Sequence, residues 1–164
     1  KENGKKIKRF EKITDMLLWR DYFRFMLKKY PNVFFKSNGF KKEKPSNQID
    51  DQLFEKWKSG NTDNEFVNQS MQMLEKTGYL PYYARVIVAS YYIQEYNLPW
   101  LKAAHWFEQN ILDYSPATNY GNWSHIANVG TSDKDNTPVD WQKLITTHYP
   151  KGIQLPEVNF VQIN

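Results

Sequence analysis

The sequence predicts an all-α protein, folded as one irregular helical bundle. Three observations support this prediction: apolar residues recur at helical spacing, prolines and glycines stand where helices would begin and end, and no segment shows a clean alternation typical of a strand. The 164 residues are 40% apolar, which is enough for a single domain with a hydrophobic core. We therefore expect residues 1–164 to form one helical domain.

The first predicted helix runs from about Phe10 to Tyr30, where Pro31 would close it. One face of this helix carries Trp19 and the aromatic or apolar residues three, four, seven and eleven positions after it: Tyr22, Phe23, Met26 and Tyr30. This spacing is typical of an amphipathic α-helix. The polar residues 36–48, which include Gly and Pro, predict a loop after it.

Four further helices are predicted in the middle of the chain. Their expected bounds are Asp50–Lys58, Asp63 or Asn64 to Lys76, Pro81–Tyr96 and Trp100–Leu112. Pro81 and Pro99 suit the start of a helix, and Gly78 suits a helix end. Residues 113–138 lose the helical pattern and predict a long loop with at most one short helix.

The composition excludes several kinds of site. The chain has no cysteine, so disulfides, thiolate metal sites and cysteine nucleophiles are excluded, and we expect a cytosolic protein. Histidines at 105, 125 and 148 are too scattered to predict a zinc site, and no other metal site is predicted. The apolar stretch 86–93 is too short to span a bilayer, and no signal-peptide pattern follows the Lys-rich start, so no membrane partner is expected.

Charge is distributed unevenly. Residues 1–45 hold 14 Lys/Arg and 5 Asp/Glu, whereas residues 46–164 hold 8 and 13. The basic first third is compatible with binding a polyanion such as DNA, although a solvated basic face explains the same charges. The first residue is Lys rather than Met, which is compatible with a piece of a longer chain.

The segment 113–123, DYSPATNYGNW, is the strongest candidate for a functional loop. It offers a carboxylate, an amide and an indole close together, on a backbone that we expect not to form a regular helix. Long aromatic loops inside compact domains are often functional. The alternative is a structural loop held by Asp and Asn side chains bonded to its own backbone.

Several stretches of the chain, in order, resemble the FAD-binding domain of the DNA photolyase/cryptochrome family, most of all its DASH branch. They are LLWRDYFRF (17–25), LFEKWKSGNT (53–62), EKTGYLPYYARVIVAS (75–90), the long segment 98–130 and LPEV (155–158). The resemblance implies the later part of a helical domain that cradles a U-shaped FAD. It also implies a blue-light flavoprotein. In this family the photoexcited reduced flavin passes an electron to a pyrimidine dimer in DNA, and a chain of tryptophans supplies electrons that reduce the flavin.

The resemblance implies cofactor-binding roles for seven residues. Asn119 aligns with the residue facing flavin N5, and Arg85 and Asp113 align with an ion pair beside the isoalloxazine. Burying such a pair is costly unless both partners remain. The other implied cofactor contacts are Trp19, in a lesion pocket next to FAD, Arg20, near the phosphates, and Tyr114 and Ser115, in the 113–123 segment.

The electron path of the family is partly retained. Trp123 aligns with the tryptophan nearest the flavin and Trp100 with the middle one, 23 residues earlier. The position of the third tryptophan is Asn47, for which a nearby tyrosine is a possible substitute. Core packing is the alternative role for each tryptophan alone.

The positions that contact the DNA lesion in the family are mostly replaced. In this chain the family's glutamate is replaced by Met16, and its Asn-Arg pair by Tyr82 and Tyr83. Its methionine is replaced by Val86, and an aromatic residue by His125. Loss of these contacts predicts eroded repair chemistry. Whether the protein is an enzyme of the deoxyribodipyrimidine photolyase type is left open.

Two functional hypotheses follow. The first is a photolyase/cryptochrome-like FAD-binding module with eroded DNA contacts. The family's α/β antenna domain and phosphate-binding loop are not found in this chain. Three explanations are open: a fragment of a longer protein, a partner chain or segment that carries the other half, or a reduced relic. The alternative is a cofactor-free helical scaffold that binds nucleic acid or a partner chain.

Overall fold

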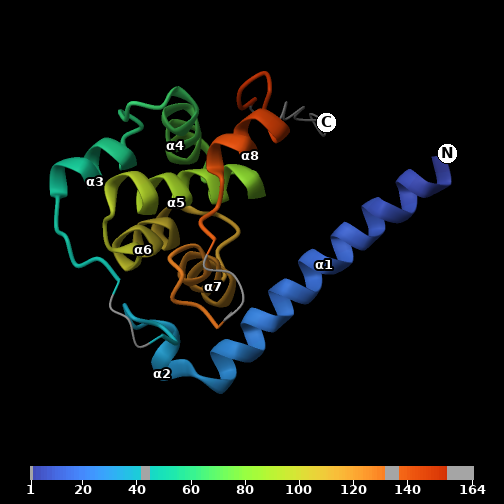
Figure 1. Cartoon of the computed structure of the whole chain (residues 1–164), viewed down its shortest axis with the longest axis horizontal. Coiled ribbons are helices and arrows are strands. Elements are labelled where there is room, and N and C mark those ends of the chain that lie inside the picture. The colour runs from blue at the N-terminus through green and yellow to red at the C-terminus, as the bar shows by residue number, and fades with distance from the viewer. Residues whose placement is uncertain (1, 42–44, 132–136, 155–164) are drawn as a thin grey trace, which may run out of the picture.

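The computed structural model describes residues 2–41, 45–131 and 137–154, with the side chains of residues 2–9 and 12 outside the description. The described residues form helices and no strands, as predicted (Figure 1). The helices are α1 (Glu2–Lys29), α2 (Pro31–Phe34), α3 (Asp51–Lys58), α4 (Glu65–Thr77), α5 (Tyr82–Tyr96), α6 (Trp100–Asn110), α7 (Pro116–Ile126) and α8 (Trp141–His148). The stretch 155–158 lies outside the described residues.

The four central helices confirm the predicted elements, and local capping explains their ends. Asp50 accepts a hydrogen bond from the Leu53 amide at 2.9 Å, and Asn64 accepts one from the Val67 amide at 3.1 Å. Such side-chain caps satisfy backbone donors that a helix start leaves unpaired. Gly78 ends α4 in the left-handed conformation, with φ of 67°, which glycine adopts without strain.

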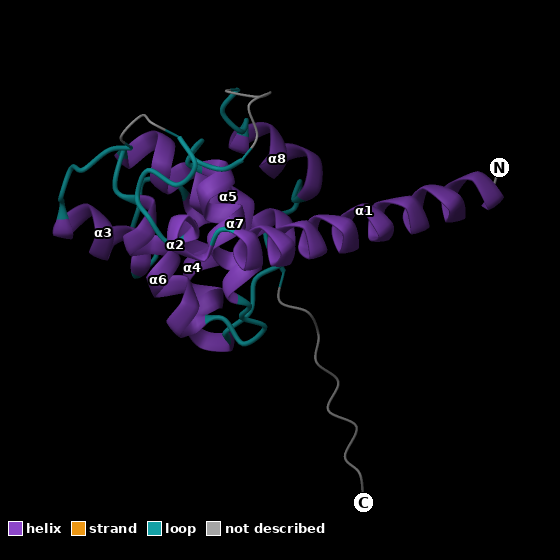
Figure 2. Cartoon of the chain, turned by 90° about the horizontal axis from the view of Figure 1, so that it is seen from below, coloured by secondary structure: helices purple, strands orange, loops and turns teal. Residues whose placement is uncertain are grey.

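The first helix is longer than predicted. It begins at Glu2 rather than Phe10, and Pro31 opens the short α2 instead of only closing α1. The start was placed too late because the polar residues before Phe10 carry no apolar periodicity. Figures 1 and 2 show the N-terminal part of α1 extending away from the body of the protein.

The one helix that the structure describes within residues 113–138 agrees with the prediction of a loop with at most one short helix, but the expectation that segment 113–123 forms no regular helix was wrong. Pro116–Ile126 forms α7, so the backbone of DYSPATNYGNW is largely helical, and α8 was not predicted at all. Pro116 occupies the first turn, where its missing N–H costs nothing. Tertiary packing then outweighs the weak helix propensity of Asn, Ser and Gly, because Tyr120 and Trp123 are buried against the core.

The core is rich in aromatic residues and lies between α3 and α7. Trp57, which is 0% exposed, stacks on Phe107 at 5.8 Å and contacts Tyr92 at 4.7 Å. Its indole N–H donates to the Val88 carbonyl at 3.0 Å, which satisfies its buried polar atom.

Across the described ranges, we find no helix with the length and hydropathy that a membrane crossing requires.

Candidate functional site

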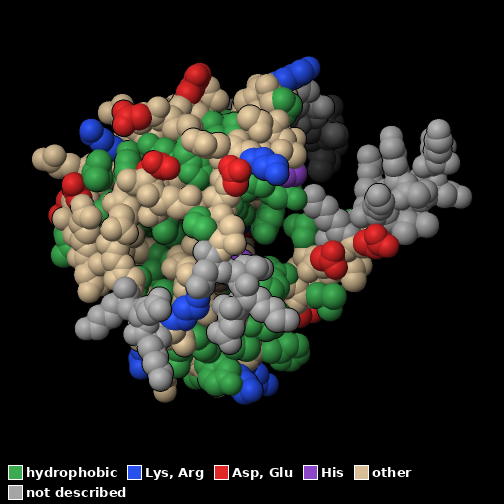
Figure 3. Space-filling model, viewed as in Figure 1, with side chains coloured by type: hydrophobic (Ala, Val, Ile, Leu, Met, Phe, Trp, Pro, Cys, Tyr) green, Lys and Arg blue, Asp and Glu red, His purple; other side chains and the backbone are tan. Residues whose placement is uncertain are grey.

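A large cavity opens between α1, α5 and α7. Its volume is about 1040 Å³, large enough for a sizeable organic ligand. Figure 3 shows the surface hollowed between α1 and the rest of the chain. Eight of the nine predicted site residues line it: Trp19, Arg20, Arg85, Asp113, Tyr114, Ser115, Asn119 and Trp123. The ninth, Trp100, is buried elsewhere.

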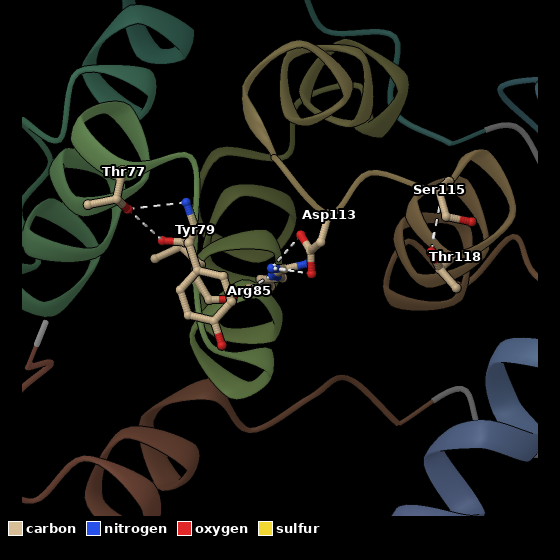
Figure 4. Close-up of polar contacts among 7 residues, drawn as sticks. Thr77, Tyr79, Arg85, Asp113, Ser115 and Thr118 are labelled. Atoms are coloured by element: carbon tan, nitrogen blue, oxygen red, sulfur yellow. Dashed lines mark hydrogen bonds and ion pairs between the residues drawn. The ribbon is translucent and has the colours of Figure 1, made fainter. Parts of the chain in front are cut away.

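The ion pair predicted between Arg85 and Asp113 forms in the cavity wall (Figure 4). Arg85 Nη2 donates to both carboxylate oxygens, at 2.8 and 3.0 Å, while Nε donates to the Leu80 carbonyl at 2.6 Å. The pair is not buried as the sequence suggested, since the side chains are 25% and 56% exposed. The exposed carboxylate therefore faces a space where a polar ligand can bind.

The backbone brings the two charged residues together. After α6 ends, the Leu112 amide donates to the Gly78 carbonyl at 2.9 Å, and Asp113 follows directly. Gly78 suits this approach, because its φ of 67° favours glycine and an added Cβ would lie 2.7 Å from Leu112 Cγ. Arg85 stands in the first turns of α5, just after the same α4–α5 connection. The turn at Gly78 thus sets the position of the ion pair.

The amide of Asn119 is fixed by α6. Its Nδ2 donates to the Ala104 carbonyl at 2.9 Å, which leaves Oδ1 to accept a hydrogen bond from a ligand in the cavity. The Asn119 backbone is held in the first turn of α7, since its amide donates to the Ser115 carbonyl at 2.9 Å. Ser115 caps this helix by position only, without a side-chain hydrogen bond.

The wall formed by α1 places Trp19 and Arg20 beside the cavity. Trp19 stacks on Tyr22 at 5.2 Å and contacts His125 edge-on at 5.6 Å. Arg20 pairs with Asp21, to which Nε and Nη2 both lie at 3.0 Å. Exposed pairs of this kind contribute little, so the guanidinium is available to an anionic ligand.

Tyr114 is held by a carboxylate that the sequence did not single out. Glu108 accepts hydrogen bonds from Tyr120 at 2.7 Å and Tyr114 at 2.8 Å. These two bonds lower the pKa of Glu108, with the bond from Tyr120 the larger cause. Partial burial, followed by the bond to Glu108, raises the pKa of Tyr114 to about 12. Nothing in the residue spacing predicts this cluster, since the three residues meet only through the α6–α7 packing.

The two tryptophans predicted to carry electrons have different aromatic neighbours. Trp123 contacts Phe107 at 5.2 Å, Tyr92 at 6.1 Å and Trp57 at 6.1 Å. Trp100 contacts Tyr120 at 6.3 Å and donates its N–H to the Ser37 carbonyl at 2.8 Å. Trp100 is not among the ring neighbours of Trp123, and the predicted electron-transfer roles remain predictions.

The replaced lesion positions gather on the same cavity. The lining includes Met16, Tyr82, Tyr83, Val86 and His125. Tyr83 stacks on the His148 ring of α8 at 3.6 Å, and its ring meets that of Tyr82 at 5.2 Å. Aromatic side chains therefore occupy the part of the wall where the resemblance implied an Asn-Arg pair.

Comparison with known proteins shows the family to which this chain belongs. Residues 13–146 match the family model described as the FAD binding domain of DNA photolyase. The chain belongs to this family. Curated relatives include the chloroplastic/mitochondrial cryptochrome DASH of Oryza sativa subsp. japonica, 37% identical over 136 residues, and the cryptochrome DASH of Danio rerio, 38% identical over 120 residues. These matches cover 83% and 73% of the chain but 23% of each relative, so the chain spans about a quarter of their length.

Solved structures of the photolyase/cryptochrome family share the fold. A cryptochrome from Synechocystis sp. PCC6803 superposes with a TM-score of 0.79 at 33% identity, over 85% of this chain and 29% of that one. An archaeal photolyase from Sulfolobus tokodaii, described with two FAD molecules, gives a TM-score of 0.72 at 29% identity, over 83% of this chain and 32% of that one. The helical arrangement predicted from the resemblance is confirmed.

Proposed function

We propose that this chain binds FAD in the cavity between α1, α5 and α7, as part of a blue-light flavoprotein. Asn119 Oδ1 would accept from the isoalloxazine, and the Arg85–Asp113 pair would lie beside the same ring. Trp19 would cover the cofactor from α1, next to Tyr114 and the Ser115 backbone, and Arg20 would contribute to the phosphates. When bound, FAD supplies light absorption and one-electron chemistry.

The observation that supports this proposal most strongly is the ion pair in an open cavity. A guanidinium and a carboxylate in contact, with the carboxylate 56% exposed, give a charged recognition point on an otherwise largely apolar wall. Flavin-type heterocycles combine a flat apolar ring with hydrogen-bonding edges, and pockets with few convergent polar groups suit such ligands. The name of the archaeal photolyase relative, which mentions FAD, supports the same cofactor.

We propose further that repair chemistry is eroded in this protein. Met16, Val86 and His125 line the cavity at positions where the family uses other side chains. Met16 offers no carboxylate to a dimer, and a site that loses its hydrogen-bonding groups loses recognition of a polar substrate. The cavity would then serve flavin photochemistry rather than lesion repair.

FAD titration of the purified chain tests the cofactor proposal. We expect quenching of flavin fluorescence and a structured visible spectrum upon binding. Asp113→Asn should weaken binding, because it removes the charge that holds Arg85 in the wall. Asp51→Asn is the matched control, since it breaks another surface ion pair, with Lys102 of α6.

Two outcomes would contradict the proposal. One is a wild-type chain that shows no flavin binding at any concentration, even when the preceding part of a DASH relative's domain is supplied as a second polypeptide. The other is an equal loss of affinity in Asp113→Asn and Asp51→Asn, which would exclude a specific role of the cavity wall.

The exposed apolar side chains of α1 support a second proposal, that α1 packs against further polypeptide carrying the rest of the family's domain. Phe10 is 67% exposed, and Ile13, Leu17, Leu18 and Phe25 are also exposed. Contiguous exposed apolar surface of this kind marks an interaction site. Co-expression with the preceding part of a DASH relative should protect α1 amides from hydrogen exchange. Unchanged exchange would count against it.

We also propose DNA contact through the basic first third and a cytosolic setting. Most of the lysines concerned lie outside the described side chains, while Arg20 and Arg24 line the cavity. DNA binding that weakens steeply with salt would support the contact, and no binding at low salt would exclude it. Cell fractionation tests the compartment, and recovery of the native protein in an organelle fraction would contradict it.

A further inference from the structure

Glu108 of α6 links two parts of the chain that follow it. Its Oε1 accepts a hydrogen bond from the Tyr114 hydroxyl at 2.8 Å, and its Oε2 accepts one from the Tyr120 hydroxyl at 2.7 Å. Tyr114 belongs to the connection between α6 and α7, whereas Tyr120 lies within α7. One carboxylate therefore holds both the connection and the helix after it.

An ionised Glu108 suits this double contact. A carboxylate only accepts hydrogen bonds, so both phenols can donate to it at once. The two bonds lower the pKa of Glu108, with the bond from Tyr120 the larger cause, and the group is therefore ionised at neutral pH. The His105 ring nitrogen lies 3.4 Å from the carboxylate, but this side chain is 62% exposed and contributes little.

The positions that Glu108 holds are next to positions that face the cavity. Tyr114 lines the cavity and directly follows Asp113 of the ion pair. Tyr120 directly follows Asn119, another lining residue. The bond from Tyr120 restrains the rotation of α7 about its axis, and this rotation decides where the Asn119 amide points.

The same face of α6 provides a second contact to this segment. The Ala104 carbonyl, one turn before Glu108, accepts from Asn119 Nδ2 at 2.9 Å. By contrast, the Ser115 side chain makes no capping bond at the start of α7, and the Asp113 carboxylate is 56% exposed. The place of residues 113–119 therefore depends on α6, and Glu108 is its charged contact.

We propose that Glu108 is a positioning residue of the cofactor site, whose carboxylate sets the places of Tyr114 and Asn119 in the cavity wall. This inference rests on the proposed FAD binding, in which both residues meet the cofactor. Glu108 itself does not line the cavity, so it acts through the two tyrosines. A binding group keeps its geometry only while its supporting contacts hold it, so loss of the carboxylate weakens binding without removing any ligand contact.

Two substitutions of Glu108 test the proposal in FAD titrations followed by fluorescence. Glu108→Ala removes both acceptors, and we expect it to weaken FAD binding by about tenfold, the loss typical of a hydrogen bond to a charged group. Glu108→Gln keeps one acceptor oxygen and can donate to the second phenol, so it should recover most of the affinity. Glu55→Ala is the matched control, because it removes a carboxylate that pairs with Lys58 on α3, outside the cavity lining.

A coupling experiment separates positioning from a general loss of stability. Tyr114→Phe combined with Tyr120→Phe removes both donors and should weaken FAD binding about as much as Glu108→Ala. Glu108→Ala added to this pair should cost little more, because the carboxylate has no hydroxyl left to hold. Additive losses would overturn the proposal, and so would a Glu108→Ala variant that binds FAD like the wild type.

Hydrogen exchange without ligand gives an independent measurement. In Glu108→Ala the amides of residues 113–119 should exchange faster than in the wild type, while those of α4 stay unchanged. Equal protection of residues 113–119 would overturn the proposal, and so would faster exchange throughout the chain, which would indicate a role in overall stability.

The wild type separates this inference from the proposed function. Failure of the wild type to bind FAD would defeat the proposed function. Normal binding by the wild type, with the same affinity in Glu108→Ala, would defeat only the positioning role of Glu108.

Discussion

The two sides of Trp123 differ in how completely they are packed. On one side, Phe107, Tyr92 and Trp57 enclose the indole in the core. On the other side lies a cavity of about 1040 Å³ bounded by α1, where Trp19 is 37% exposed. The core side is satisfied by contacts within the chain, whereas the cavity side leaves ring faces, an arginine and a carboxylate open to a ligand.

This difference separates the residues that stabilise the fold from those that would recognise a cofactor. The core buries aromatic side chains whose removal leaves a void that the surroundings cannot fill. Lining side chains outside this core, such as Met16 and Val86, contribute less packing, so we expect them to be exchangeable without loss of the fold. The replaced lesion positions, such as Met16 and Val86, all lie on the cavity side.

Substitution of Trp57 should have the largest effect on the core side. Trp57→Ala is expected to lower the free energy of unfolding by about 3–5 kcal/mol, because it opens a cavity among fully buried rings. Trp19→Ala on the cavity wall should cost less than half as much. Denaturant unfolding measures both. Equal losses would show that the cavity side is as tightly packed as the core.

Gly121 tests how closely α1 is held against the body. A Cβ at this position would lie 2.3 Å from the ring of Phe23, so Gly121→Ala should cost about 1–3 kcal/mol through overpacking. Hydrogen exchange should show loss of protection in α1 and little change in α5. Gly130→Ala, whose Cβ would lie 3.3 Å from its nearest neighbour, is the control with the smaller expected cost. Unchanged hydrogen-exchange protection in α1 would mean that the close approach of Phe23 to Gly121 is not needed to hold α1 against the body.

Asp113 should matter for ligand binding and hardly for stability. Its pair with Arg85 is partly exposed, with side chains 25% and 56% accessible, so Asp113→Asn should change the free energy of unfolding by less than about 1 kcal/mol. Thermal unfolding without ligand measures this change. A larger loss would place the ion pair among the residues that stabilise the fold.

The smallest expected effect is a pH dependence at Tyr114. Because its pKa is raised from 10.0 to about 12, the folded state favours the neutral phenol. Its contribution to stability is complete below pH 10 and is lost as the pH rises toward 12. Conversely, the lowered pKa of Glu108 gives stability that is lost as the pH falls through the pKa of the folded state.

Glu108→Gln isolates the part of the raised Tyr114 pKa that comes from the Glu108 carboxylate. The tyrosinate absorbance of Tyr114 should appear at lower pH than in the wild type, but not at the ordinary value, because burial is the larger cause of the shift. Tyr114→Phe identifies the signal by removing it. An unchanged titration would exclude the hydrogen bond as a cause.

Local signals predicted the central helices well and the last third poorly. Asp50, Asn64 and Gly78 mark helix ends through their own side chains or backbone freedom, so their positions are readable in the sequence. The 113–123 segment contains Pro, Asn and Gly, which signal turns, yet most of it is helical, and Tyr120 and Trp123 are buried in the core from this helix. The family resemblance nevertheless predicted site residues in this segment that line the cavity: Asp113, Tyr114, Ser115, Asn119 and Trp123.

The sequence by itself determined the helical class, the capped central helices and the family, because these depend on short-range chemistry and on ordered motifs. Only the tertiary structure decided which side chains meet. Trp57 and Trp123 are 66 positions apart and touch, while Trp100 and Trp123 are 23 apart and do not have their rings in contact. Sequence spacing does not encode such distances, since contacts between helices depend on how each helix packs into the core.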